Sequence, residues 1–440
     1  MRKTTGSALI GGEEVSVWWL PSCRVKETEM EYGVKSFVLS VDTLGATTDL
    51  LLDAAEFYQQ GLIVLTSSPD QLLDEIGRER ASAAALQLVS VDFGAPEEVQ
   101  NTVRSLAKQY RLAGVMIQSD RAAVLGACIA QDLGLPAHPV STMRVCRDKS
   151  QTRRALAAAG IRSILFSEVT SSVWALEKAE AIGYPLIVKD PSGTGSANVF
   201  VVNNASELAD ATAEILATRN SVLLEEFLRG PLFSAECVIR NGGVTILGYS
   251  NRELTEFPDF NELGLTFPAD IPPKWKEKAH TYVESVSKAV GLRNGFAHIE
   301  FILTNDGPQV VEVNPRMGGI GLGRMLSLAL RDNVFKIAVA LSLGLTPPVP
   351  LTSKGIHVGC KILGAKSKGR IRSIRGVEAL GGFPGFTSLN LVRRPGDIVA
   401  SARDYRNTVG YLLSTGETPS LAYDYARAAA ATIVIETQIA

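Results

Sequence analysis

The segment that decides the fold, "QVVEVNPRMGG" (Gln309–Gly319), alternates polar and apolar side chains. Glu312, Asn314 and Arg316 occupy every second position, with apolar residues between them. This period of two is typical of a β-strand, whose successive side chains point to opposite faces, so the three polar groups share one face. Taken alone, the pattern favours the solvated face of an antiparallel sheet.

The sequence before this strand predicts that it is one arm of a hairpin. Two strand-like runs flank Asn305, Asp306 and Gly307, a composition that suits a three-residue loop ending in glycine. With the loop centred on Asp306, Glu300 and Glu312 lie directly opposite each other, because each is six residues from the centre. Cβ atoms paired in this way are about 4.5–5.5 Å apart, and two carboxylates there repel by roughly 3 kcal/mol at an effective dielectric constant of about 20. Water, a proton or a cation could relieve that repulsion.

The other groups on this face favour a cation. Asn314 adds an amide oxygen to the two carboxylates, and no thiolate or histidine cluster accompanies them. This donor set suits Mg²⁺ or Mn²⁺, which keeps water and substrate phosphate among its ligands. Arg316 follows on the same face, where it could neutralise charge on a transferred phosphoryl group. The hairpin therefore predicts a metal site of Glu300, Glu312 and Asn314 beside a catalytic arginine, Arg316.

A metal and an arginine predict a phosphate-binding loop elsewhere, and "VKDPSGTGSAN" is the candidate. Lys189 ends a strand-like run, and Gly193, Gly195 and Ser196 follow in a run of small residues. Small residues let the main chain approach an anion and present its N–H groups. The stretch is no P-loop, because the lysine precedes the glycines. A flexible surface hairpin is the alternative interpretation.

The composition is that of a globular protein. A chain of 440 residues with 46% hydrophobic content suggests two to four domains. A formal charge of -2 gives no global field to attract nucleic acid or an anionic membrane. The cysteines are odd in number and never form C-x-x-C, which argues against disulfides and zinc. Without a signal peptide or a long apolar span, a cytoplasmic protein is expected.

Strand-like and helix-like runs alternate along the first part of the chain. Between residues 35 and 140 they predict an α/β domain with an open parallel sheet. No G-x-G-x-x-G follows its first strand, so no dinucleotide site is predicted. Residues 1–34 remain unassigned. A second unit covers residues 141–350, and a strand-rich α+β subdomain covers residues 351–440.

Together these motifs resemble the ATP-grasp superfamily over roughly residues 144–350. The pattern H-x-E at His298–Glu300, followed by E-x-N-x-R at Glu312–Arg316, is specific in combination. The resemblance implies ATP and Mg²⁺ (or Mn²⁺) as cofactors. It also implies an ATP-grasp fold with a lid over about residues 180–228, preceded by a pre-ATP-grasp domain.

The resemblance further implies roles for residues outside the hairpin. Lys149 in "RDKSQTRRAL" and Lys189 match the two lysines that contact ATP phosphates, and "LLEEFLRG" resembles the hinge that holds adenine. The implied ATP-binding residues are Lys149, Lys189, Gly193, Gly195, Ser196, Glu225, Glu226, Phe227, Leu228 and Glu236.

Within the superfamily, the chain resembles the L-amino acid ligases and related carboxylate-amine ligases. The shared motifs are G-P-x-F-S-x-E at Gly230–Glu236 and E-x-G-x-x-x-P-A at Glu262–Ala269. This resemblance implies that an amide or peptide bond forms through an acyl phosphate, with release of ADP and phosphate. It also implies that Glu262 contacts the substrate's amino group.

Three positions depart from the family pattern. Leu232 replaces a glutamate that could contact the ribose, and Leu265 removes a polar group from the expected amino-acid pocket. Asn198 replaces a glycine but tolerates left-handed backbone.

The implied substrates are a small carboxylate, such as an amino acid, and an amine or peptide. A homo-oligomer is compatible with the sequence. Two alternatives stay open: a carboxylase or carbamoyl-phosphate type of ATP-grasp reaction, and a non-catalytic ATP-binding module.

Overall fold

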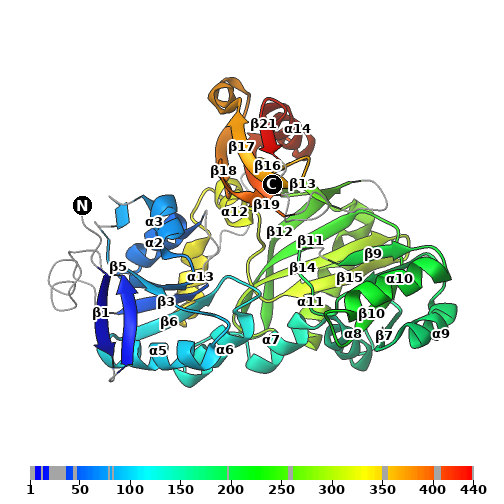
Figure 1. The fold of residues 1–440 in the computed structure, drawn as a ribbon, viewed down its shortest axis with the longest axis horizontal. Helices are drawn as coiled ribbons and strands as arrows, with labels where there is room; N and C mark the ends of the chain where they lie inside the picture. Colours follow the sequence, from blue (N-terminus) through cyan, green and yellow to red (C-terminus); the bar gives the residue numbers. More distant parts are fainter. Residues whose placement is uncertain are drawn as a thin grey trace.

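The computed structural model describes residues 5–10, 13–18, 36–42, 47–77, 80–81, 84–195, 198–255, 261–348, 355–400 and 408–438. Two α/β regions lie at opposite ends of the molecule, and the C-terminal part rises between them (Figure 1). None of the helices within these ranges is both long and apolar enough to cross a membrane.

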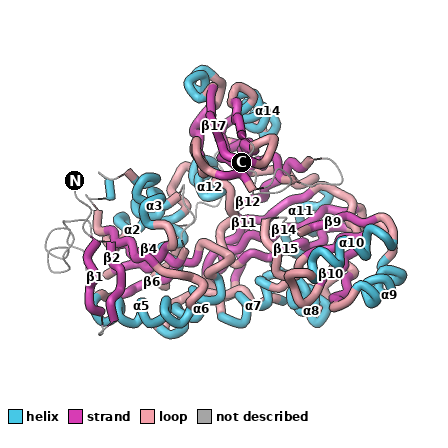
Figure 2. The backbone as a smooth tube through the Cα atoms, in the orientation of Figure 1, coloured by secondary structure: helices cyan, strands magenta, loops and turns pink. Residues whose placement is uncertain are grey.

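The N-terminal unit confirms the predicted α/β domain. Its parallel strands are β3 (Phe37–Val41), β4 (Gly61–Thr66), β5 (Leu86–Ser90) and β6 (Leu112–Ile117), in the order β5-β4-β3-β6. These strands are almost wholly apolar because helices cover both faces of the sheet (Figure 2). The helices are α2 (Thr48–Phe57), α3 (Pro69–Ile76), α5 (Pro96–Gln109) and α6 (Ala123–Asp132). An antiparallel hairpin, β1 (Thr5–Ile10) and β2 (Glu13–Trp18), extends the sheet beside β5, in the segment that sequence analysis left unassigned.

Two short helices, α7 (Val140–Arg147) and α8 (Lys149–Ala158), lead into a small lid unit. Its four antiparallel strands have the order β7-β10-β8-β9, and α9 (Ser172–Ile182) and α10 (Ala205–Leu216) pack against them. The strands are β7 (Phe166–Val169), β8 (Leu186–Lys189), β9 (Val199–Val202) and β10 (Val222–Glu226). The predicted lid, about residues 180–228, contains β8, β9, α10 and β10; β7 precedes it in the chain and pairs with β10.

An eight-stranded antiparallel sheet forms the centre of the molecule, in the order β15-β14-β11-β12-β13-β16-β20-β18. Its strands are β11 (Leu232–Arg240), β12 (Gly243–Leu254), β13 (Glu262–Phe267), β14 (Gly295–Thr304), β15 (Gly307–Asn314), β16 (His357–Gly364), β18 (Phe386–Leu391) and β20 (Thr408–Gly416). The predicted boundary near residue 350 lies outside the described residues, and the central sheet includes strands from both sides of it because β13 pairs with β16. The C-terminal unit is thus an extension of the central sheet.

The remaining elements complete the core. They are α11 (Pro273–Ala289), α12 (Leu322–Leu330), α13 (Phe335–Ser342), α14 (Pro419–Ala430), a short 3-10 helix (Val377–Gly382) and the small sheet β19 (Ile398–Val399), β17 (Gly369–Arg375) and β21 (Val434–Gln438). Ile337 and Leu341 of α13 are buried in one cluster with Val38 of β3 and Val358 of β16. This shared core ties the N-terminal unit to the central sheet.

His138, just before α7, makes a buried contact between these units. Its Nδ1 accepts the Arg293 amide N–H at 3.0 Å, so its Nε2 carries the proton and donates to the Phe296 carbonyl oxygen at 3.0 Å. Burial lowers the pKa of His138 to about 4, which means that the folded protein holds this ring neutral.

We predict that this histidine makes the protein less stable in acid. The unfolded chain binds a proton near pH 6.5 and the folded chain only near pH 4, so the free energy of unfolding should fall as the pH is lowered through that window. Urea unfolding between pH 4 and 7 measures the slope. His138→Gln should flatten it, whereas His280→Gln, at an exposed histidine, should not. Equal slopes in wild type and His138→Gln would contradict the assignment.

Candidate active site

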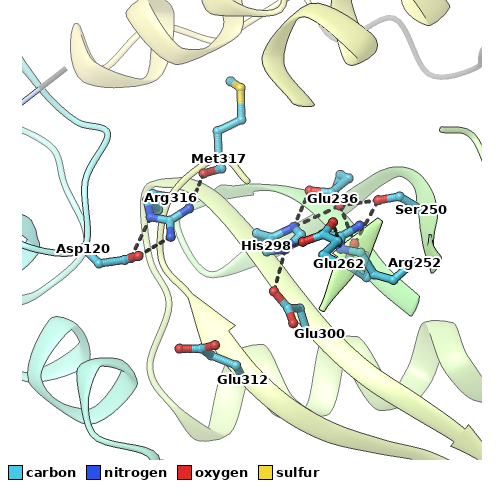
Figure 3. Close-up of polar contacts among 12 residues, drawn as sticks. Asp120, Glu236, Ser250, Arg252, Glu262, His298, Glu300, Glu312, Arg316 and Met317 are labelled. Atoms are coloured by element: carbon cyan, nitrogen blue, oxygen red, sulfur yellow. Dashed lines mark hydrogen bonds and ion pairs between the residues drawn. The ribbon is translucent and has the colours of Figure 1, made fainter. Parts of the chain in front are cut away.

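β14 and β15 bring two carboxylates face to face. The strand register places Glu300 opposite Glu312 and His298 opposite Asn314, which confirms the predicted pairing of the acids. Both glutamates line one cavity, and Figure 3 shows their side chains on the same side of the hairpin.

The predicted loop of this hairpin was wrong by one residue. Thr304 pairs with Gly307, so the loop contains only Asn305 and Asp306. A β-bulge at Val311 adds one residue to β15 and restores the register beyond it. Without the bulge, Glu300 would lie opposite Val311 and the paired carboxylates would be lost.

A buried ion cluster holds the bulge. Arg153 of α8 donates from Nη2 to the Val311 carbonyl oxygen at 2.8 Å and from Nε to Glu225 Oε1 at 2.9 Å. Lys189 Nζ lies 2.5 Å from the other Glu225 oxygen. Burial works to raise the pKa of Glu225, but Arg153 and Lys189 outweigh it and hold the pKa below its ordinary value. Glu225, which is predicted to contact ATP, thus holds Lys189 through its carboxylate and also lines the cavity described below.

Lys149 connects the hairpin to the predicted phosphate loop. It is the first residue of α8, whose N-cap Asp148 accepts the amide N–H groups of Ser150 and Gln151. The Lys149 ammonium lies 3.0 Å from Glu312 Oε1 and donates to the Gly193 carbonyl oxygen at 2.7 Å. Both predicted lysines therefore point to the same place as the two acids.

These groups form the polar end of a cavity of about 280 Å³. Its other end is apolar and suits a purine ring. The predicted residues that line the cavity are Lys149, Lys189, Gly193, Gly195, Glu225, Glu226, Phe227, Leu228, Glu262, Glu300 and Glu312. Additional apolar lining residues are Ile164, Ile187, Val199, Leu232, Leu254 and Ile302. Ser196 lies outside the described residues.

The strand that enters the predicted adenine hinge is tied down at its end. The Glu226 amide donates to the Leu165 carbonyl oxygen at 3.0 Å, and Glu226 Oε1 accepts the Leu165 amide at 2.9 Å. The Glu226 amide and carboxylate are therefore both already hydrogen-bonded within the lid unit.

At two positions near the cavity, the backbone conformation explains the type of residue. Asn198, after the phosphate loop, has φ +55°, which confirms the expected left-handed conformation. Gly230, which opens the G-P-x-F-S-x-E motif, has φ +148°, and a Cβ atom there would lie 2.3 Å from the Leu303 carbonyl oxygen. Only glycine allows this close approach to β14.

Glu236, which is predicted to contact ATP, is buried within the central sheet. It does not line the cavity, and its carboxylate accepts hydrogen bonds from Ser234 (2.8 Å), Ser250 (2.7 Å) and His298 Nδ1 (2.9 Å). Burial works to lower the pKa of His298, but Glu236 and Glu300 raise it to about 9. In turn, burial works to raise the pKa of Glu300, and His298 lowers it to about 2. The network keeps Glu300 ionised.

Sequence analysis missed Arg252, which lines the cavity beside Glu262. Arg252 Nε lies 2.9 Å from Glu262 Oε1, and Arg252 Nη2 lies 3.0 Å from His298 Nε2 (Figure 3). Glu262 therefore faces the ligand space as part of an ion pair. Leu265 lies elsewhere: it is buried in the core and does not line this cavity.

Arg316 is held by a residue of the N-terminal unit. Its Nε donates to Asp120 Oδ1 at 2.6 Å, its Nη2 donates to the other Asp120 oxygen, and its Nη1 donates to the Met317 carbonyl oxygen at 2.8 Å (Figure 3). Burial works to lower the pKa of Arg316, but Asp120 raises it above its ordinary value. Arg316 does not line the 280 Å³ cavity, and sequence analysis missed Asp120.

The acids at the polar end fit a hard divalent cation. Glu300 is ionised, Glu312 faces it, and Asn314 lines a small cleft that adjoins Glu312. In the described ranges, no group of three or more His, Cys, Asp or Glu side chains could hold a metal ion. A cation here would take its remaining ligands from the Asn314 amide, water and nucleotide phosphate, as Mg²⁺ commonly does.

Sequence comparisons agree with this geometry. A sequence model of the ATP-grasp domain matches residues 182–323, and one of the L-amino acid ligase C-terminal domain 2 matches residues 361–438. The chain is 28% identical over 367 residues to the uncharacterized protein y4rH of Sinorhizobium fredii, covering 82% of this chain and 74% of that protein. It is 24% identical over 340 residues to carnosine synthase 1 of Homo sapiens, covering 71% of this chain and 40% of the synthase. The chain thus spans less than half the length of that synthase.

The fold is shared with a solved ligase structure. The L-amino acid ligase from Bacillus licheniformis superposes with a TM-score of 0.78 at 22% identity, covering 92% of this chain and 99% of the ligase. The resemblance to the ATP-grasp superfamily and to L-amino acid ligases is confirmed.

Two neighbouring arginines test the buried ion cluster. The Arg153 side chain is wholly buried and Arg154 is 57% exposed in a surface ion pair with Glu168. Arg153→Leu should lower the free energy of unfolding by about 3–5 kcal/mol, because it leaves Glu225 buried without one partner. Arg154→Leu should cost less than about 1 kcal/mol. Urea unfolding of the ligand-free proteins measures both, and similar losses in the two variants would contradict the account.

Proposed function

We propose, from the premise that this chain contains an ATP-grasp domain followed by an L-amino acid ligase C-terminal domain, that it joins a carboxylate to an amine at the expense of ATP. The observation that carries the proposal is the Glu300–Glu312 pair at the polar end of the cavity, with Lys149 and Lys189 beside it. Facing carboxylates and two lysines suit a metal-bound triphosphate.

The cavity orients the nucleotide. Phe227, Leu228 and Leu232 surround its apolar end, where a purine ring would exclude water. The triphosphate would then extend towards the lysines, the acids and the loop at Gly193. Leu232 contributes apolar contact and no carboxylate, so ribose recognition at this position is weaker than the family motif implies.

ATP is needed because a carboxylate is a poor electrophile for an amine. A carboxylate oxygen of the substrate attacks the γ-phosphorus of ATP, and the bond from that phosphorus to the bridging β-phosphate oxygen breaks. ADP departs, and the substrate is now an acyl phosphate. The amine then attacks the acyl carbon, loses a proton, and inorganic phosphate departs from the new amide. A divalent cation, when bound, neutralises phosphate charge. Lys149 and Lys189 spread the charge on the triphosphate, and Arg316 stabilises the transferred phosphoryl group.

The phosphate loop is placed to exclude water. Lys149 holds it through the Gly193 carbonyl oxygen, and Arg147 donates to the Ser192 carbonyl oxygen. Closure of this loop over the nucleotide would protect the acyl phosphate from hydrolysis, which otherwise competes with the amine.

The most suitable acid is an amino acid. Glu262 and Arg252 offer an anion and a cation at the end of the cavity, and such a pair can receive a zwitterion. The relatives' names, L-amino acid ligase and carnosine synthase, agree with this substrate class. ATP and Mg²⁺ or Mn²⁺ are the proposed cofactors.

The experiment is a screen for phosphate release with Mg-ATP and pairs of acids and amines, in which mass spectrometry identifies the product of each hit. We expect phosphate release that requires both an acid and an amine and yields an amide. Release that depends on bicarbonate would favour a carboxylase or carbamoyl-phosphate reaction. ATP binding without any substrate-dependent release would favour a non-catalytic module.

Replacement of Arg316 should separate chemistry from binding. Arg316→Ala should lower kcat by about 10²- to 10³-fold, the typical cost of losing one preorganised donor, while the affinity for ATP stays within about threefold. Arg104→Ala, in an exposed ion pair with Asp132, is the control and should keep full activity. An Arg316→Ala enzyme with wild-type kcat would remove this residue from the mechanism.

Replacement of one facing acid should weaken the metal site. Glu312→Gln keeps the shape of the side chain but removes its charge, so the Mg²⁺ concentration for half-maximal turnover should rise by more than about tenfold. Glu284→Gln, at a half-exposed acid of α11, should leave that concentration unchanged. Turnover of the two variants is measured against free Mg²⁺ at saturating ATP. Identical Mg²⁺ curves would show that Glu312 is not a ligand.

A further inference from the structure

We infer that Asp120 is a positioning residue for Arg316, and that the loop after β6 thereby completes the active site from the N-terminal unit. The inference rests on the proposed ligase function. It gives the N-terminal unit a part in the chemistry, since Asp120 and Arg316 are 196 residues apart in the chain.

The contacts of Arg316 leave little freedom to its guanidinium group. Two of its N–H groups point to the Asp120 carboxylate and a third points to the Met317 carbonyl oxygen. A guanidinium has five N–H donors, so two remain, one on each terminal nitrogen. The two remaining N–H groups of Arg316 therefore point in a fixed direction. A bidentate contact with a carboxylate fixes this direction better than a single hydrogen bond would.

The loop that carries Asp120 is itself braced on both sides. Ser119 Oγ donates to Asp42, and Arg121 donates to the same carboxylate from Nη2 at 2.7 Å and from Nε at 3.1 Å. Asp42 follows β3 directly and is 4% exposed. Because both neighbours of Asp120 are anchored to one buried acid, the Asp120 side chain is left to face Arg316.

Asp120 also competes with Glu312, a proposed metal ligand, for the Arg316 guanidinium. Asp120, Glu312 and Asn314 line one small cleft, so Arg316 lies where Glu312 also attracts it. A guanidinium that turned to Glu312 would neutralise the carboxylate that should bind the cation. The bidentate contact with Asp120 prevents this turn and keeps Glu312 available. The carboxyl ends of parallel strands, where Asp120 and Asp42 lie, are also the usual place for ligand contacts in α/β units.

A double-mutant cycle tests the inference on the full chain. Asp120→Asn should lower the kcat of amine-dependent phosphate release by about 10- to 10²-fold and Arg316→Ala by about 10²- to 10³-fold, with the KM for ATP nearly unchanged in both. The double variant should be no slower than Arg316→Ala, because Asp120 acts only through the arginine. Asp132→Asn, in an exposed ion pair with Arg104 in the same unit, is the matched control and should keep the wild-type kcat.

Guanidinium ions provide a second readout that a merely structural role would not affect. Added at millimolar concentration, guanidinium should restore part of the kcat of Arg316→Ala, because Asp120 still marks the place of the lost group. It should not restore the double variant. Additive losses in kcat, equal rescue of both proteins, or an Asp120→Asn enzyme as fast as wild type would overturn the inference. A faster Asp120→Asn enzyme would show that Asp120 restrains Arg316 instead of positioning it, and would also overturn it.

Failure of the ligase proposal can be recognised separately. If the wild type releases no phosphate with any acid and amine, the ligase function is excluded, and the Asp120–Arg316 pair is then judged by thermal unfolding of the same four proteins. A double variant that melts no lower than the less stable single variant would support a coupled pair. A melting temperature lowered by the sum of both single shifts would reject it.

Discussion

The arrangement of the site depends on the electrostatic repulsion between two carboxylates that face each other across a hairpin. Glu300 and Glu312 would repel by roughly 3 kcal/mol at the distance of a directly paired position, and burial strengthens that repulsion. Each acid has its own cation: His298 donates to Glu300, and Lys149 pairs with Glu312. In the proposed complex, a divalent metal would take the place of these counter-charges between the two acids.

The pair exists only because distant parts of the chain cooperate. The bulge at Val311 sets the register of the acids, and Arg153 of α8 holds the bulge while it also holds Glu225. Since Glu225 positions Lys189 of the lid, one buried cluster aligns the hairpin, the linker helix and the lid lysine. The large core shared by the N-terminal unit and the central sheet fixes the loop of Asp120 against Arg316 in the same way.

Sequence patterns predicted the features of the fold that depend on interactions between residues close together in the chain. Alternating apolar runs predicted the parallel sheet, its helices and the β14–β15 hairpin, and the small-residue loop follows Lys189 at the end of β8. The pairing of Glu300 with Glu312 was predicted from the wrong loop, because "NDG" allows two or three loop residues and the compensating bulge depends on Arg153, 158 residues from Val311. The sequence did not show which side chains Glu225 and Glu236 pair with, since an acid on a strand reveals its face only when its partners are known.

Asp120 and Arg252 were not predicted, because the sequence does not show which side chains they contact. Asp120 nevertheless follows β6, the last parallel strand of an α/β unit, where ligand contacts are common.

The most direct test of the metal-binding pair is the anomalous scattering of Mn²⁺ in crystals of the protein with ADP. The account predicts a manganese peak between Glu300 and Glu312, within bonding distance of both carboxylates and of a phosphate oxygen. A nucleotide bound in the cavity with its manganese ion away from these two acids would contradict it.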